Sequence, residues 1–195
     1  MNFETAGTVK GVSKIPTFSG RNVDPLNLWP EDIDISDIAH ALSRIARFTG
    51  HTDGEFAFSV AQHSCIVSDQ LPDELKLWGL LHDASEAYLN DVSRPLKYSP
   101  AFKGYHAIEK QAMAAIVAKF KLSPDNEPEA VKQADVVSLS TEFRDLMTKF
   151  TQTEYWEQVK PRMPKPLPFT IVPWAPQQAE FEFLSRYARI NKVSR

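Results

Sequence analysis

Residues 72–89 read PDELKLWGLLHDASEAYL, and this stretch decides the fold class of the chain. Its apolar side chains recur at the spacing of one helix face, at Leu75, Trp78, Leu81 and Ala84. Pro72 is typical of a helix start, because its fixed φ suits the first turn. The spacing therefore predicts a largely buried helix that ends near Leu89.

The same periodicity predicts helices on both sides of this stretch, over residues 34–50, 56–71, 105–120, 128–150 and 177–190. Before the last of these, the sequence PRMPKPLPFT at 161–170 is expected to be extended or looped, because proline lacks the N–H donor of a helix. The first thirty residues show no sustained periodicity. They are expected to be irregular, with one short strand or hairpin around residues 11–18.

These elements predict an all-α fold, a single helical bundle with irregular ends. We expect an irregular N-terminal arm at 1–33 and the bundle core at 34–150. Residues 151–195 are expected to hold the Pro-rich segment and a C-terminal helix that packs on the core. The chain has 195 residues, a length that suits one domain.

Composition narrows the function classes. The net charge is −3 and no long basic run offsets it, so binding of nucleic acid is disfavoured. The longest apolar stretch, residues 112–118, is far shorter than the roughly 20 residues that cross a bilayer, and no apolar signal core begins the chain. We therefore expect a cytoplasmic protein without a membrane partner. Neither a Gly-rich dinucleotide motif nor a P-loop motif occurs, which removes the main support for those folds.

Four potential metal ligands fall on helices that should pack together: His63, His82, Asp83 and Asp135. Cys65 is the only cysteine, so a metal would have to be held by histidines and carboxylates. Two imidazoles and two carboxylates suit a divalent cation. Histidines on helices are more often ordinary core or surface residues than metal ligands. The neighbouring residues therefore decide between these two interpretations.

Two further carboxylates follow the His-Asp pair. Glu86 lies four residues after His82, one turn along the same predicted helix, where a general acid or base beside the metal belongs. Asp91 lies five residues further on. With Asp83, these groups concentrate negative charge that a cation would compensate. The alternative is a solvated acidic helix end, and the apolar residues around Trp78 argue against it.

Three segments together resemble a known family: QHS at 62–64, LLHDASEAYLNDVSRPLKY at 80–98, and Asp135. They are similar to the H…HD…D signature of the HD-domain metal-dependent phosphohydrolases. The second segment resembles in particular the bacterial 5′-deoxynucleotidases and the small phage-type nucleoside triphosphate triphosphohydrolases, among them a dATP triphosphohydrolase. The resemblance covers roughly residues 34–150.

The resemblance implies a set of ligands for one divalent cation, such as zinc, cobalt, manganese or magnesium: His63, His82, Asp83 and Asp135. It implies that Glu86 handles the proton of the attacking water. Asp91 would assist at the phosphate or at the leaving group. A metal suits this chemistry because it activates water and neutralises phosphoryl oxygens.

The resemblance also places substrate contacts. Arg47, sixteen residues before His63, would meet the phosphate, and Phe48 would border the sugar, where nucleotidase-type relatives usually carry Trp. Gln62 stands where those relatives usually carry Glu. Lys97 falls where related triphosphohydrolases place a phosphate-binding lysine. His51 follows Arg47 by four residues and is a further candidate for substrate contact.

The expected function is hydrolysis of a phosphate ester in a deoxynucleoside mono- or triphosphate, through a metal-activated water. One alternative is a cyclic-nucleotide phosphodiesterase, although the histidine-rich extension of many such enzymes is not evident. Another is a non-catalytic nucleotide-binding regulatory module. The intact ligand set weighs against the last. The partner is therefore a small-molecule nucleotide, and the resemblance implies a homo-oligomer.

Overall fold

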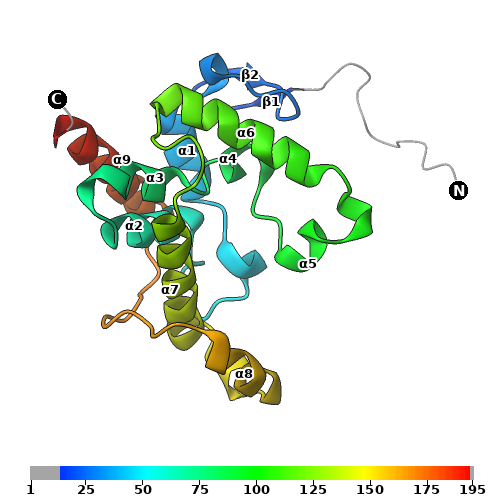
Figure 1. Ribbon diagram of the computed structural model, residues 1–195, viewed down its shortest axis with the longest axis vertical. Helices are drawn as coiled ribbons and strands as arrows, with labels where there is room; N and C mark the ends of the chain where they lie inside the picture. Colours follow the sequence, from blue (N-terminus) through cyan, green and yellow to red (C-terminus); the bar gives the residue numbers. More distant parts are fainter. Residues whose placement is uncertain (1–13, 194–195) are drawn as a thin grey trace, which may run out of the picture.

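Helices dominate the computed structural model, which describes residues 14–193 (Figure 1). In chain order they are α1 Ile35–Leu42, α2 Val60–Asp69, α3 Lys76–Leu81, α4 Glu86–Leu89, α5 Arg94–Lys97, α6 Tyr105–Phe120, α7 Glu129–Leu146, α8 Glu154–Val159 and α9 Pro176–Val193. Within the described residues the sheet is one antiparallel hairpin of β1 Ile15–Pro16 and β2 Asn22–Val23. The predicted all-α class is confirmed.

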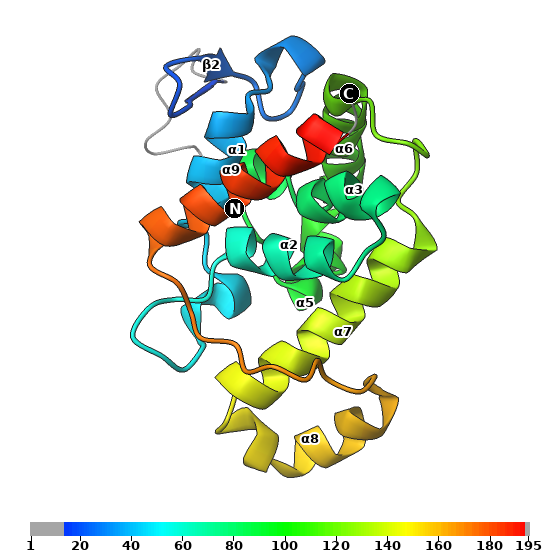
Figure 2. The same cartoon turned by 90° about the vertical axis from the view of Figure 1, so that its left-hand side faces the viewer.

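The core lies where three sequentially distant parts of the chain meet. Helix α9 packs on α1, α2 and α3, and crosses in front of α1 in Figure 2, and α7 packs on α2. Phe183 of α9 is fully buried in the same hydrophobic cluster as Ile38 and Leu42 of α1. Helix α2 is therefore enclosed, and every residue from Val60 to Ser68 is buried. The sequence of α2 includes one of the candidate ligands.

A buried carboxylate of α1 holds the hairpin against the bundle. Asp37 of α1 accepts hydrogen bonds from the backbone N–H of Ser19 at 2.6 Å and from its hydroxyl at 2.8 Å. The hairpin confirms the expected short strands, with bounds shifted toward residue 23. The first part of the expected strand, residues 11–13, lies outside the described residues.

The first predicted helix is shorter than expected. It begins as predicted, because the Asp34 side chain accepts from the N–H of Ser36, but it ends at Leu42 and not near Gly50. The prediction of the longer helix was wrong because the following residues pair elsewhere: the N–H of Arg47 donates to the carbonyl of Phe58 at 2.9 Å. This pairing leads the chain into a short 3₁₀ turn over Arg47–Gly50. Helix α2 likewise begins only at Val60, after its Ser59 cap.

The helix predicted over residues 72–89 is interrupted. A 3₁₀ turn precedes α3, and a second tight turn over residues 82–85 separates α3 from α4. In that turn the N–H of Ala84 bonds to Leu81 and the N–H of Glu86 bonds to Asp83, each across three residues and not four. The prediction of one continuous helix was therefore wrong. The break falls on the His-Asp pair.

The later helices begin where the periodicity predicts. Helix α6 begins after Gly104, and α9 covers the predicted 177–190. Helix α7 begins after Pro128 but ends at Leu146, short of the predicted residue 150. Of the stretch 161–170, expected to be extended or looped, residues 163–170 form no helix, but its first two residues belong to a short 3₁₀ turn over Lys160–Arg162. The sequence reading did not foresee α8, whose first turn is capped by the side chain of Thr153. In the part of the chain that the structure describes, no helix is both long and apolar enough to span a bilayer.

Candidate functional site

The four candidate ligands converge from three separate elements. His63 lies in the buried α2, His82 and Asp83 lie in the turn after α3, and Asp135 lies in α7. His63 Nε2 is 3.2 Å from His82 Nε2, 3.2 Å from Asp135 Oδ1 and 3.6 Å from Asp83 Oδ2. His82 Nε2 is also 3.2 Å from Asp83 Oδ2. The turn between α3 and α4 thus carries His82 and Asp83, two adjacent residues whose side chains both lie close to His63 Nε2.

Both imidazoles are oriented by their other ring nitrogen. His82 Nδ1 lies 2.8 Å from the carbonyl oxygen of Gly79, which can only accept, so Nδ1 carries the proton. His63 Nδ1 lies 2.6 Å from Glu142 Oε1, which favours the same tautomer. Each neutral ring then directs the lone pair of Nε2 toward the other ring. Two lone pairs at this separation repel unless a cation or a proton lies between them.

This donor set fits a divalent cation. His63, His82 and Asp83 form a compact group that could hold a metal ion, and Asp135 contacts the same nitrogen of His63. Ligand atoms that share a metal at about 2.0–2.2 Å lie roughly 3.0–3.5 Å apart, close to the separations found here. Histidines held through a carboxylate or a carbonyl are the usual arrangement around metals in proteins.

The charges of the group are strongly coupled. Burial opposes a charge on His82, but the charge and hydrogen bond of Asp83, the charge of Asp135 and the Gly79 carbonyl together raise the pKa of the ring to about 10. Burial also opposes ionisation of Asp135, yet the hydrogen bond and charge of His63 lower its pKa to about 2. The pKa of Asp83 is lowered as well, by both imidazoles against the effect of burial. The carboxylates of Asp83 and Asp135 are therefore stabilised by positive charge close to them. Protons on the imidazoles supply that charge when no metal is bound.

Glu86 lies beside this group at the start of α4. The sequence predicted that Glu86 and His82 share one helix, but the turn over residues 82–85 separates them. The carboxyl is buried, and Oε2 has no hydrogen-bond partner among the described residues. Burial, with added repulsion from Asp83 and Asp91, raises the pKa of Glu86 well above its usual range. Lys97 Nζ lies 3.9 Å from Oε1. Glu86 is thus a carboxyl able to hold a proton next to the candidate ligands.

A cavity of about 530 Å³ opens onto this group. Asp83, Glu86 and Asp135 line it, and Asp91 and Lys97 line it as well. The other polar lining residues are Arg47, Thr49, Ser93 and Arg94. Its apolar wall comes from Phe48, Val92, Pro95, Leu139, Phe143, Val159 and Met163. An adjoining cavity of about 580 Å³ shares Asp83, Glu86 and Asp135 but is lined mainly by charged and polar residues. The group therefore faces space on two sides.

Arg47 and Phe48 lie at the mouth of the apolar cavity. Arg47 is largely buried, with Nη1 3.5 Å from Asp83 Oδ2 and Nε 3.0 Å from Glu142 Oε2. Phe48 has φ of 54°, in the left-handed region that L-residues seldom adopt, and its ring packs 5.6 Å from that of Phe143. The turn over Arg47–Gly50 thus places both residues beside the candidate ligands.

The other predicted contacts differ in position. Lys97 Nζ donates a hydrogen bond to Glu109 Oε1 at 2.7 Å, and Lys97 lines both cavities. Asp91 lines the apolar cavity, where burial raises its pKa. His51 is exposed and does not line either cavity. The structure therefore brings together all the predicted site residues except His51.

Sequence reasoning missed Glu142. This residue lies seven positions after Asp135, two turns along α7, and its carboxylate is completely buried between His63 and Arg47. Burial opposes its charge, but Arg47 and His63 keep its pKa below the usual value. The spacing of Asp135 and Glu142 on one helix face was the available signal.

Gln62, the neighbour of His63, has a structural contact. Its side chain donates to the carbonyl of Val172 at 2.8 Å and accepts from the N–H of Trp174 at 2.8 Å. The amide thereby holds the Pro-rich segment against α2. It does not hydrogen-bond to the His63 ring, whose partner is Glu142.

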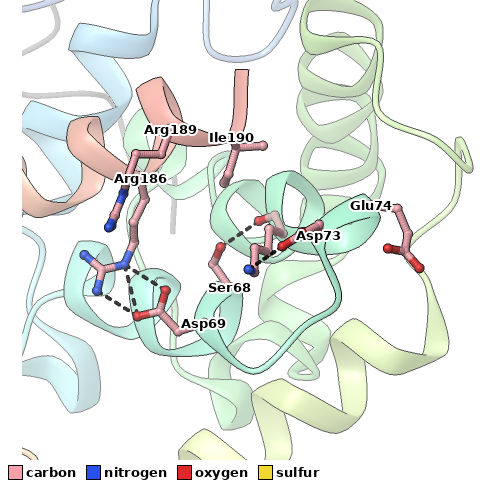
Figure 3. Close-up of a pocket in the computed structure, with 8 residues that line it drawn as sticks. Ser68, Asp69, Asp73, Glu74, Arg186, Arg189 and Ile190 are labelled. Carbon is pink, nitrogen blue, oxygen red and sulfur yellow. Dashed lines mark hydrogen bonds and ion pairs between the residues drawn. The ribbon is translucent and has the colours of Figure 1, made fainter. Parts of the chain in front are cut away.

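A further cavity, of about 500 Å³, lies between the end of α2 and α9 (Figure 3). Its charged side chains are largely paired with one another: Arg186 binds Asp69 at 2.7 Å, and Lys76 binds Asp73. It contains none of the predicted site residues. The candidate site is therefore the pair of cavities around the His-Asp group.

Comparisons with known proteins agree in part with this assignment. No family model matches the chain. It is 35% identical over 182 residues to the uncharacterized protein YfdR of Escherichia coli, covering 93% of this chain and 98% of YfdR. It is 39% identical over 134 residues to the uncharacterized protein RCAP_rcc00048 of Rhodobacter capsulatus, covering 64% and 68%. It is 27% identical over 135 residues to the 5′-deoxynucleotidase PM0747 of Pasteurella multocida, covering 60% of each chain.

Proposed function

Because this chain belongs to the same protein family as YfdR of Escherichia coli, and is more distantly similar to a 5′-deoxynucleotidase, we propose that it is a metal-dependent nucleotide phosphohydrolase. One observation carries the proposal. The Nε2 atoms of His63 and His82 face each other at 3.2 Å, with both Nδ1 atoms engaged elsewhere and carboxylates beside them. The proposed substrate is a deoxynucleoside mono- or triphosphate.

In this proposal His63, His82, Asp83 and Asp135 hold one divalent cation. When bound, such a cation lowers the pKa of water and neutralises charge on phosphoryl oxygens. Asp83 also lies 3.5 Å from Arg47, so a bound phosphate would meet a guanidinium next to the ligands. The cation is proposed to be zinc, cobalt, manganese or magnesium. Imidazole ligands suit zinc, and carboxylate ligands suit manganese and magnesium.

Glu86 is the proposed site of proton transfer from the attacking water. Its Oε2 has no hydrogen-bond partner within residues 14–193, and its raised pKa suits a group that takes up and releases a proton. Asp91 is proposed to act at the leaving group. Its carboxyl lines the apolar cavity, where the nucleoside would lie. Both carboxyls line this cavity, so both would lie close to a phosphate bound in it.

Substrate binding is proposed to divide between charge and aromatic contact. Arg47 and Lys97 bind phosphate oxygens, and Lys97 can do so by exchanging its contact with Glu109. Phe48 and Phe143 offer an apolar wall to the sugar and base. Small-molecule sites commonly combine such an apolar wall with a few charged groups.

The experiment that tests this function is a product screen. The purified chain is supplied in turn with Mn²⁺, Co²⁺, Zn²⁺ or Mg²⁺ and incubated with nucleoside monophosphates, nucleoside triphosphates and cyclic nucleotides. Free phosphate from monophosphates would identify a nucleotidase, and intact triphosphate from nucleoside triphosphates would identify a triphosphohydrolase. The Asp83→Ala variant, purified identically, controls for contaminating phosphatases. Absence of metal-dependent turnover on every nucleotide would contradict the proposal, and turnover of cyclic nucleotides alone would replace it with a phosphodiesterase.

A further inference from the structure

Glu142 is a completely buried carboxylate that no step of the proposed function uses. It projects from α7 into the space between α2 and the turn that carries Arg47. Its side chain has no exposure to solvent. A carboxylate buried in this way is costly unless each oxygen is hydrogen-bonded, so its contacts should account for its presence.

The two oxygens of Glu142 have different partners. Oε1 lies 2.6 Å from His63 Nδ1, and Oε2 lies 3.0 Å from Arg47 Nε. The guanidinium Nε–H is always a donor. His63 must also donate from Nδ1 if its Nε2 is to keep a free lone pair. Glu142 therefore has to accept a hydrogen bond at both oxygens at once.

We propose that Glu142 is a positioning residue that fixes the tautomer of His63 and the orientation of Arg47 together, so that the metal ligand and the phosphate contact are set by one side chain. This inference rests on the proposed function, because it assumes that His63 binds metal and that Arg47 binds phosphate. It adds a structural link between the metal ligand His63 and the phosphate contact Arg47. The residues come from α2 and from the 3₁₀ turn, and α7 joins them.

The requirement for a carboxylate follows from hydrogen-bond geometry. A glutamine at this position has the same size but offers one acceptor oxygen and one donor NH₂ group. If its oxygen faces Arg47, its NH₂ group faces His63 Nδ1 and favours the tautomer with the proton on Nε2, where metal would bind. If its oxygen faces His63, two donors meet at Arg47. Aspartate keeps both acceptors on a shorter side chain.

The test measures metal binding directly, without turnover. The full chain is freed of metal and titrated with Co²⁺, and the visible absorption of bound Co²⁺ reports affinity. Glu142→Gln should weaken Co²⁺ binding about 10–100-fold, the range typical for loss of a group that orients a metal-binding histidine. Glu142→Asp should recover part of that loss. KM for the nucleotide should rise in Glu142→Gln as well, because Arg47 loses its fixed orientation.

Asp37→Asn is the matched control. Asp37 is also a buried carboxylate that accepts two hydrogen bonds, but both come from Ser19 and neither involves the candidate site. This variant should lose stability and keep the wild-type affinity for Co²⁺. Equal Co²⁺ affinity in Glu142→Gln and wild type would overturn the inference. An equal loss in Asp37→Asn would overturn it too, since the effect would then be general destabilisation.

A second measurement covers the case in which Glu142→Gln does not fold. Nitrogen-15 NMR of the wild-type chain loaded with Zn²⁺, a diamagnetic probe, reports which ring nitrogen of His63 carries the proton. The proton should be on Nδ1, in a short hydrogen bond. The resonance of that Nδ1–H proton should lie far downfield, as a short hydrogen bond to the Glu142 carboxylate requires, and an ordinary imidazole N–H resonance would contradict the inference. If the wild-type chain binds no Co²⁺ or Zn²⁺ at all, the proposed function fails first, so the two failures are distinguishable.

Discussion

At the scale of single residues, the candidate site is defined by which atoms already have partners. Both histidines use Nδ1 for a hydrogen bond to a neighbouring oxygen. Glu86 Oε2 has no hydrogen-bond partner in the part of the chain that the structure describes. Arg47 donates a hydrogen bond to Glu142 and forms an ion pair with Asp83. Substitutions that preserve shape while changing one atom therefore separate binding from proton transfer.

Glu86→Gln is the clearest of these substitutions. Gln keeps the size of the side chain but cannot accept the proton, so metal should stay bound and kcat should fall roughly 10²–10⁴-fold. Metal content and steady-state kinetics measure the two effects separately. Glu74→Gln, which alters an exposed carboxylate away from the site, should leave both unchanged. Loss of metal in Glu86→Gln would make Glu86 a ligand, and unchanged turnover would remove it from the proposed mechanism.

Arg47→Lys keeps the positive charge and removes the planar fork. A lysine cannot donate to Asp83, Glu142 and a phosphate in the same way, so kcat/KM should fall by about tenfold or more. The surface residue Arg44, which binds Glu180 at 2.8 Å, provides the control, because Arg44→Lys should leave kcat/KM unchanged. Wild-type efficiency in Arg47→Lys would exclude a phosphate contact at this residue.

At the scale of elements, the Pro-rich segment depends on side chains of its neighbours, since its own backbone makes few hydrogen bonds. Asp145 of α7 accepts from the N–H of Ile171 at 2.8 Å, and Thr141 accepts from the N–H of Leu167 at 3.0 Å. Gln62 of α2 makes two further contacts with the segment. The segment is therefore held by α7 and α2, the helices that also carry His63 and Asp135.

Gln62→Ala should destabilise the fold by about 1–3 kcal/mol, because it leaves a backbone N–H and a carbonyl without their partner. Urea unfolding measures the change. Gln178→Ala, on the exposed face of α9, is expected to stay within about 0.5 kcal/mol of wild type. If Gln62→Ala proved as stable as Gln178→Ala, the amide would not be holding the segment.

Asp145 gives this attachment a pH dependence. Burial opposes its ionisation, but Arg144 and the N–H of Ile171 lower its pKa below the usual 3.8. A carboxylate with a lowered folded-state pKa contributes stability that is complete above the unfolded-state pKa and is lost as the pH falls through the folded-state pKa. The difference in urea midpoint between wild type and Asp145→Asn should be constant near neutral pH and shrink below about pH 4. A difference that does not vary down to pH 2.5 would contradict this assignment.

The elements also show what the sequence can and cannot predict. Periodicity and start signals predicted α6, α7 and α9, because those helices follow local rules. The end of α1 and the break at residues 82–85 could not be predicted in this way, since they depend on backbone contacts such as that of Arg47 with Phe58. In the candidate site, residue type and the family resemblance predicted His63, His82, Asp83 and Asp135, and the structure brings these four side chains together. Glu142 was missed because its role depends on partners 79 and 95 residues away in sequence.

At the scale of the whole molecule, the proposed cation would join α2, α7 and the turn after α3. A ligand that binds only the folded state stabilises it by about 2.7 kcal/mol at a concentration of 100 times Kd. For a chain of 195 residues this corresponds to a rise in Tm of roughly 5–10 °C. Thermal unfolding with added Mn²⁺, and with EDTA, should show this shift. The shift should be absent in Asp83→Ala, and an equal shift in that variant would place the metal elsewhere.

The central claim is that one metal centre, formed by His63, His82, Asp83 and Asp135, is required for nucleotide hydrolysis. The most direct measurement is activity during titration of the metal-free chain with Mn²⁺, using the nucleotide found most active in the product screen. Activity should start near zero, rise in proportion to added metal and level off at about one equivalent per chain. Asp83→Ala should stay near the baseline throughout. Full activity before any metal is added, or a wild-type titration in Asp83→Ala, would contradict the account.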